Sequence, residues 1–185
     1  MKIQTINVKL TGIKPLIFNV FTSIEDKVPT EKKVPVIDGK LAITGDRILA
    51  FFIANNPTAP PGCIKLFTDS KKYKALLPKV KAYVGFQPII PVLVDGKEVA
   101  FKGFDKTPQV KKRTDQVGGG LTQIVERPYV ENWSLEFTFN LIENAEISME
   151  RLKEWFMRGG IEVGLGASRP VYGQFVVDRF EEVKK

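Results

Sequence analysis

Apolar and polar residues alternate near the N-terminus and again near residue 140, and both alternations predict β-strands. Ile6, Val8 and Leu10 are separated by polar residues, and over 134–142 four apolar residues alternate with Glu, Thr and Asn. A period of two places the apolar side chains on one face of a strand. We therefore expect strands with one buried face, with the phenylalanines of 134–142 in the core and not on a solvent-facing platform.

Further strands and two helices are predicted around these. The first strand is expected to continue beyond a bulge over 16–21, and 174–180 predicts the last strand. Residues 44–54 form an apolar run that Thr44 or Asp46 could cap, which predicts a buried helix. A serine-capped amphipathic helix is predicted over 148–158, with Gly159 as its C-terminal stop.

Turn residues predict two hairpins and a loop. Asp-Gly at 95–96 joins two apolar runs and predicts a β-hairpin. Residues 102–127 are rich in Lys and Arg around three glycines at 118–120, which predicts a basic hairpin that projects from the body and has a flexible tip. The polar segment 22–33 predicts a long loop.

The order of these elements predicts the fold class. Strand, helix, strands, strand, helix and strand follow one another, which is the βαββαβ order of an α+β, ferredoxin-like fold. The hairpin region at about 89–130 is then an insertion before the third strand. We expect one domain over residues 1–185, with helices on one face of the sheet.

The charge of the chain favours a polyanionic partner. Lys and Arg number 28 against 21 Asp and Glu, a net charge of +7. The densest basic run, 71–81, is either a solvated surface or a nucleic-acid contact. We expect no membrane span, because no run of about 18 apolar residues is present. The single cysteine, Cys63, suits a reducing cytoplasm.

The chain contains no histidine, which removes several classes of chemistry. His-based acid–base catalysis, His-containing triads and His-ligated metal sites are all excluded. One cysteine cannot build a thiolate zinc site within the chain. We expect no cofactor and no metal site, so any catalysis would rest on carboxylates, Lys, Arg, Tyr or an added metal ion.

The strongest candidate site is the glycine-rich segment 159–173, GGIEVGLGASRPVYG. Glycines let backbone amides approach a bound anion, and successive amides can form an anion-binding nest. An arginine at 169 adds a fork of donors suited to phosphate. A tight connection that needs positive φ would require the same glycines. The predicted phosphate-binding residues of this segment are Gly164, Gly166, Ser168, Arg169 and Gly173.

Several segments, taken in order, resemble the RAMP superfamily of CRISPR-associated proteins, especially its crRNA-binding backbone subunits. Residues 8–16 are similar to the family's first strand with its Pro-Leu pair, and 36–49 to the glycine/serine segment that opens its first helix. Residues 110–126 resemble its thumb hairpin and 133–141 the strand that follows. The final helix, glycine-rich segment and strand resemble its glycine-rich motif.

The resemblance implies a subunit that binds single-stranded guide RNA along its palm. Its partners would be other CRISPR-complex subunits or copies of itself, and the thumb would press between bases. Phosphate neutralisation would then give most of the affinity, which would depend on salt and little on sequence. Two alternatives stay open: a metal-dependent endoribonuclease that cleaves target RNA, and a viral or mobile-element protein of this fold that acts through protein–protein assembly.

Other residues are candidates of lesser weight. Gly45 and Arg47 lie in the first turn of the first helix, whose amides could bind phosphate, although Asp46 would repel it. Side chains of the basic hairpin could contact RNA or be solvated. The residues concerned are Lys111, Lys112 and Arg113. Three aromatics could stack on bases, although packing in the core or at an edge is the favoured interpretation. These are Tyr129, Trp133 and Tyr172.

The endoribonuclease alternative depends on carboxylates near the first loop. The resemblance implies that an aspartate there would act with a metal ion. The candidates are Glu25, Asp26 and Asp38. Surface solubility is the favoured interpretation of all three, so we expect a binding protein and not an enzyme.

Overall fold

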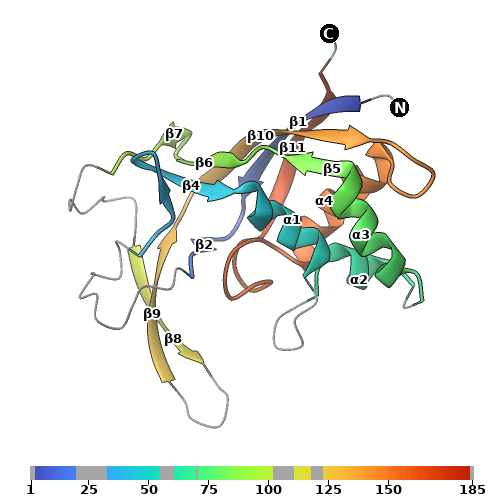
Figure 1. The fold of residues 1–185 in the computed structure, drawn as a ribbon. Coiled ribbons are helices and arrows are strands. Elements are labelled where there is room, and N and C mark those ends of the chain that lie inside the picture. The colour runs from blue at the N-terminus through green and yellow to red at the C-terminus, as the bar shows by residue number, and fades with distance from the viewer. Residues whose placement is uncertain are drawn as a thin grey trace.

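The structure is an α+β fold in which an antiparallel sheet carries helices on one face (Figure 1). This computed structural model describes residues 3–19, 33–54, 61–69, 71–101, 111–117 and 123–183. The strands are β1 (Ile3–Gly12), β2 (Leu16–Ile17), β3 (Val36–Ile37), β4 (Lys40–Thr44), β5 (Val84–Phe86), β6 (Ile89–Val94), β7 (Lys97–Glu98), β8 (Lys111–Val117), β9 (Gln123–Val130), β10 (Trp133–Ile142) and β11 (Phe175–Glu182). The helices are α1 (Gly45–Ile53), α2 (Cys63–Phe67), α3 (Tyr73–Tyr83) and α4 (Met149–Glu162).

The strand order is that of a ferredoxin-like fold. The main sheet runs β11-β1-β10-β6-β4-β3, and β5 also pairs with β10. Because β5 and β6 are consecutive and both pair antiparallel with β10, together they take the place of the second strand. The last strand therefore lies beside the first, and the third lies between the first and the second. The predicted fold class is confirmed.

The two central strands explain which face is buried. In the antiparallel register of β1 and β10, Val8 lies opposite Phe137 and Ile6 opposite Phe139, and all four side chains are buried. The intervening pairs, such as Lys9 opposite Glu136, lie on the other face. The prediction that the phenylalanines of this strand belong to the core is confirmed.

Aromatic rings join the helices to the sheet. Phe51 and Phe52 of α1 have ring centroids 5.7 Å and 4.9 Å from that of Phe156 in α4. Phe156 also lies 6.3 Å from Phe139 of the sheet. Figure 1 shows the helices gathered on this one side of the sheet, as the sequence predicted. Such ring pairs add to the free energy gained from burial alone.

Helix α4 does not stop at Gly159 as predicted. It continues to Glu162. Gly159 and Gly160 lie inside the helix, where it packs closely against Cys63 and Phe175. A Cβ on Gly159 would lie 2.4 Å from Sγ of Cys63, and one on Gly160 would lie 2.4 Å from the carbonyl oxygen of Phe175. Gly164 lies just beyond the C-cap residue Val163, has a φ of +70°, and donates its amide to the carbonyl of Gly159.

Three further elements differ from the expectation or were missed. Residues 16–17 do not continue β1, because β2 pairs with β9 in a separate three-stranded sheet, β2-β9-β8. The basic run 71–81 falls largely within α3, which contains Pro78. The short helix α2 was not predicted. Its Cys63 is buried against α4, and burial raises the pKa of that thiol.

Both predicted hairpin regions contain paired antiparallel strands. Asp95 and Gly96, with φ of 51° and 74°, form the turn between β6 and β7. Strands β8 and β9 pair from Lys111 opposite Tyr129 onward, and they extend away from the main sheet (Figure 1). The glycines at 118–120 lie outside the described residues, as does most of the predicted loop 22–33. Within the described part of the chain, no helix has the length and apolarity needed to cross a bilayer.

The contact surface of α4 gives a test of this packing. Ala normally stabilises a helix interior over Gly by about 1 kcal/mol. We expect Gly159→Ala to do the opposite and to lower the free energy of unfolding by about 1–3 kcal/mol, because the added methyl group overpacks the contact with Cys63 and Phe51. Chemical denaturation measures the change. Gly85→Ala is the control, since its Cβ would meet nothing within 4 Å, and stabilisation by Gly159→Ala would contradict the packing argument.

Candidate nucleic-acid interface

The glycine loop, residues 163–174, is held against the segment that follows β1. The amide of Ala167 donates to the carbonyl of Ile17 at 2.9 Å, and the amide of Gly173 donates to the carbonyl of Pro15 at 2.8 Å. The amide of Ile13 donates to the carbonyl of Gln174 at 2.8 Å. The loop is therefore fixed to β2 and to the turn before it.

Two of the predicted phosphate-binding glycines have a structural role in this loop. Gly173 has a φ of +69°, and a Cβ there would lie 1.8 Å from the carbonyl oxygen of Leu165. Gly164 ends α4. The amides of both residues donate to backbone carbonyls, those of Pro15 and Gly159. These two amides are therefore already bonded within the protein, and an anion would have to bind elsewhere on the loop.

The remaining predicted residues of the loop reach the surface. Gly166 is exposed and adopts a φ of +77°, and Ser168 and Arg169 are half-buried. Desolvation lowers the pKa of the Arg169 guanidinium, with an opposing contribution from Cys63. An arginine nevertheless stays protonated at neutral pH. Arg169 therefore places a partly desolvated positive charge in the loop.

A side-chain contact joins the glycine loop to the base of the β8–β9 hairpin. Nη1 of Arg127 in β9 donates to Oγ of Ser168 at 3.0 Å, and the contact is partly buried. Next to it, the amide of Phe18 donates to the carbonyl of Pro128 at 3.0 Å. Arg127 was counted only among the basic residues of the hairpin in the sequence, and nothing there indicated its contact with Ser168. The register places it opposite Arg113.

The three basic candidates of the hairpin lie at the start of β8. Lys111 begins β8, and its ammonium group lies 2.5 Å from a carboxylate oxygen of Glu131. This hydrogen bond raises the pKa of Lys111. Both side chains are about half exposed, at 50% and 45%, so the pair is weak and the ammonium group can exchange partners. Lys112 and Arg113 follow on the same strand, and their side chains lie outside the described part.

The first turn of α1 is less suited to phosphate than predicted. The amide of Gly45 donates to the carbonyl of Pro88 at 3.1 Å. A Cβ on Gly45 would lie 2.5 Å from the carbonyl oxygen of Gln87. The glycine is thus required by the close approach of α1 to the turn before β6. Asp46 and Arg47 are exposed side by side, so the local charge is mixed.

The carboxylate candidates have no assembled site among the described residues. Asp38 is exposed in the two-residue turn between β3 and β4, where it and Gly39 have φ of 51° and 73°. Asp-Gly hairpins favour this geometry, which explains Asp38 without catalysis. In the described part of the chain, no three possible metal-ligating side chains of His, Cys, Asp or Glu gather together. Glu25 and Asp26 lie outside the described residues.

The aromatic candidates divide into a core residue and two surface residues. Trp133 is fully buried, and its Nε1 donates to the carbonyl of Lys14 at 2.8 Å, so it cannot stack on a base. Tyr129 and Tyr172 are half-buried. The open face of β1 and β10 carries polar residues such as Asn7 and Thr138 and no aromatic ring.

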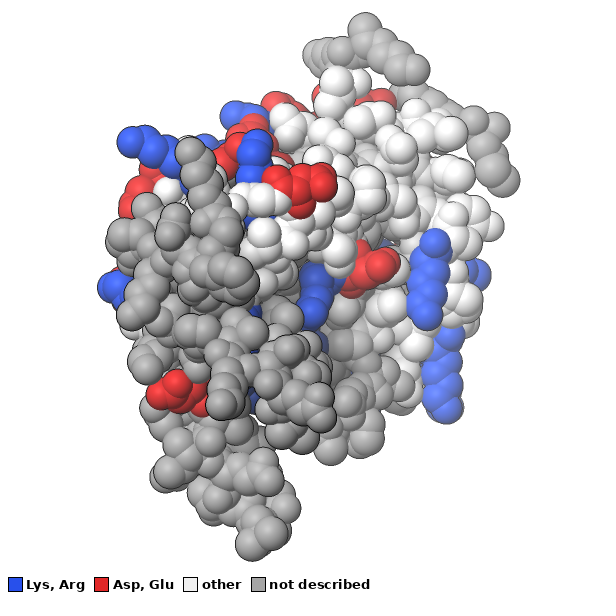
Figure 2. Space-filling model, turned by 60° about the vertical axis from the view of Figure 1, so that its left-hand side comes forward, with Lys and Arg blue, Asp and Glu red and all other residues white. Residues whose placement is uncertain are grey.

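Charges of both signs occur on the hairpin side of the molecule. Figure 2 shows Lys and Arg side chains interspersed with Asp and Glu over the described part of this face. The described part of this face therefore carries mixed charge, and Arg127 and Arg169 belong to the two elements that meet at the junction of glycine loop and hairpin.

Comparison with known proteins supports the fold. No family model matches the sequence, and no curated protein matches it. The chain is similar to a chain in the cryo-EM structure of the type III-B Cmr-β complex bound to cognate target RNA, with a TM-score of 0.55 and 13% identity. The match covers 99% of this chain but 61% of the other, so this chain spans less than two thirds of that subunit.

A second similar structure is Cmr6 from Pyrococcus furiosus. Its TM-score is 0.45 with 12% identity, and the match covers 95% of this chain and 99% of Cmr6. The match to the Cmr-β chain shows a shared fold, and the fold expected from the RAMP resemblance is confirmed.

The contact between Arg127 and Ser168 can be tested directly. Ser168→Ala removes the acceptor, and we expect the amides of Ala167 and Gly173 to exchange with solvent roughly fivefold faster, for a lost hydrogen bond of about 1 kcal/mol. Hydrogen exchange followed by mass spectrometry measures this. Thr5→Val is the control, because it removes a side-chain hydrogen bond to Asn140 elsewhere in the sheet. Equal acceleration in both variants would show that the contact does not anchor the loop.

Proposed function

We propose that this protein is a single-stranded RNA-binding subunit of a CRISPR-type ribonucleoprotein complex. Three observations support the proposal: a fold shared with a chain of an RNA-bound Cmr-β complex, a net charge of +7, and a junction of basic residues on the hairpin side. Other subunits of the complex or further copies of this chain are its expected protein partners, and guide RNA is its expected ligand.

The contact of Arg127 with Ser168 carries the proposal. It brings the glycine loop, which precedes the last strand, to the base of a hairpin inserted before the third strand. The register places Arg113 opposite Arg127 on that hairpin. An RNA phosphate bound at the junction would meet the guanidinium group of Arg127.

The chemistry of binding follows from which charged groups lie near the junction. Arginine guanidinium groups suit phosphate because two of their donors can engage it at once. Arg127 and Arg169 would hold the backbone at the junction, and Lys111 could leave Glu131 for a phosphate. The open sheet face has no aromatic platform for bases on β1 and β10. We therefore infer that affinity comes from phosphates and depends little on sequence.

The nuclease alternative remains distinct from this proposal. It rests on Asp26 or Asp38, and incubation with guide RNA, complementary RNA and Mg²⁺ would identify it by regularly spaced cuts. We propose binding without cleavage: the turn geometry accounts for Asp38, and Asp26 lies outside the described residues.

The role of the hairpin is tested by the triple variant Lys111→Gln, Lys112→Gln and Arg113→Gln. We expect weaker binding to every single-stranded RNA tested. We also expect the slope of log K against log salt to fall by about 2, at roughly 0.7 for each lost phosphate contact. Fluorescence anisotropy with labelled oligonucleotides, measured across a salt series, gives both quantities.

The matched control removes three positive charges from helices. Lys74, Lys81 and Lys153 are exposed on α3 and α4, and their replacement by Gln changes the net charge equally. We expect this control to keep most of the salt slope. If the two triple variants lose affinity equally, only the net charge matters and the hairpin is not the RNA contact.

A further inference from the structure

A cavity is lined by residues of α3 and α4 and by the end of α2. These helices lie away from β8 and β9 (Figure 1). Its volume is about 590 Å³, and its floor includes the buried side chains of Leu76 and Trp155 together with the half-buried ring of Phe67. Small-molecule sites in proteins are usually about 300–1,000 Å³ and combine an apolar floor with a few polar groups. The cavity thus has the size of a site for one small ligand.

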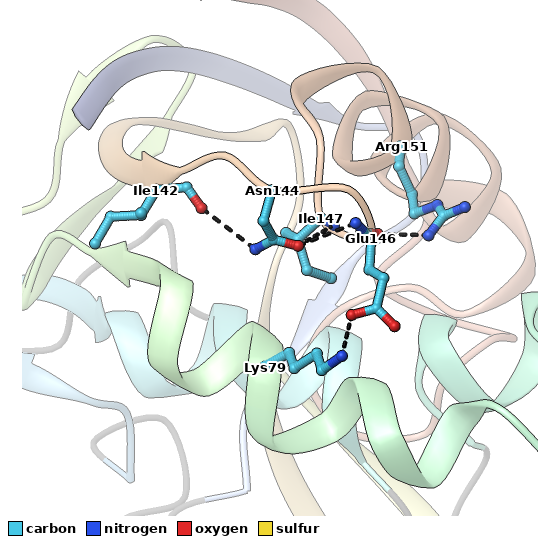
Figure 3. Close-up of polar contacts among 6 residues, drawn as sticks. All are labelled: Lys79, Ile142, Asn144, Glu146, Ile147 and Arg151. Atoms are coloured by element: carbon cyan, nitrogen blue, oxygen red, sulfur yellow. Dashed lines mark hydrogen bonds and ion pairs between the residues drawn. The ribbon is translucent and has the colours of Figure 1, made fainter. Parts of the chain in front are cut away.

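The charged groups that line the cavity are not balanced. Lys71, Lys72 and Arg151 contribute three positive charges, and Glu146 and Glu154 contribute two negative ones. Each carboxylate, however, is paired with a cation that does not line the cavity. Glu146 pairs with Lys79 (Figure 3), and Glu154 lies 3.7 Å from Arg158.

The positive charges that line the cavity are less neutralised by ion pairs within the protein than the negative ones. Among the described residues, the ammonium groups of Lys71 and Lys72 have no carboxylate partner, and both side chains are exposed. Because the two lining carboxylates are paired elsewhere, a bound molecule meets an excess of positive charge. The cavity therefore favours an anion.

The loop beside α4 holds part of this lining in place. Oδ1 of Asn144 accepts hydrogen bonds from the amides of Glu146 and Ile147, each at 3.0 Å (Figure 3). The guanidinium group of Arg151 donates to the carbonyl of Glu146. This arrangement fixes Arg151 at the rim before any ligand binds, which lowers the entropy cost of binding.

We propose that this cavity binds a nucleoside phosphate. The three lining cations would hold the phosphate, the apolar floor would cover the base, and the carboxylate oxygens of Glu146 or Glu154 would accept hydrogen bonds from ribose hydroxyl or base amino groups. An acidic peptide would instead bring several carboxylates close to Glu146 and Glu154, and this repulsion would oppose its binding. A free nucleotide and the phosphorylated end of an RNA strand present the same chemistry.

The test is calorimetric titration of the full-length protein with AMP, UMP, adenosine and inorganic phosphate. A ten-nucleotide RNA is titrated with a terminal phosphate and without one. We expect AMP or UMP to bind more tightly than adenosine or phosphate alone. Lys71→Glu with Lys72→Glu should weaken that binding at least about tenfold. The control, Lys74→Glu with Lys81→Glu, makes the same charge change on exposed positions of α3 outside the cavity and should change binding less than about twofold.

The two tryptophans locate the bound ligand. Trp155 lines the cavity, whereas Trp133 is buried against the carbonyl of Lys14. In a ¹⁵N-labelled sample, the indole resonance of Trp155 should shift on titration while that of Trp133 stays in place. Binding by mononucleotides points to a free nucleotide, and binding only by the phosphorylated oligonucleotide points to a strand end. Equal affinities in both charge variants, absence of binding by every phosphate-bearing probe, or displacement of AMP by an acidic peptide that binds more tightly would overturn the proposal.

Discussion

The close approach of α4 to the structure beneath it depends on two residues without side chains. Gly159 faces Cys63 and Phe51, and Gly160 faces the carbonyl of Phe175, with no room for a Cβ in either place. This contact sets the position of α4 on the helices and on the last strand. Because the glycine loop begins where α4 ends, the same contact decides where the loop meets β2 and the hairpin.

The glycines of the glycine loop have a structural role. Gly164 ends a helix, and Gly173 lets two parts of the loop approach closely, and each of their amides already has a backbone acceptor. A nest built from these amides would lose hydrogen bonds that hold the loop. A phosphate at this position would be bound by side chains, above all by Arg169 on the loop and Arg127 on β9 beside it.

The sequence predicted the elements whose pattern is local. The alternation over 134–142, the serine cap of α4 and the Asp-Gly turn at 95–96 each depend on neighbours in the chain, and each appears in the structure. Prediction from the sequence failed where contacts between distant parts of the chain determine the structure. Gly159 has the properties of a helix stop, but packing against Cys63 keeps it inside α4.

The candidate site was likewise predictable only in its local features. Its loop and hairpin could be found from composition, but the contact of Arg127 with Ser168 joins residues far apart in the sequence, and no periodicity indicates such a pair. Helix α3 was not predicted, because the run 71–81 was interpreted only by its charge, as a solvated surface or a nucleic-acid contact. In the structure, Leu76 and Val80 bury one face of this helix in the core.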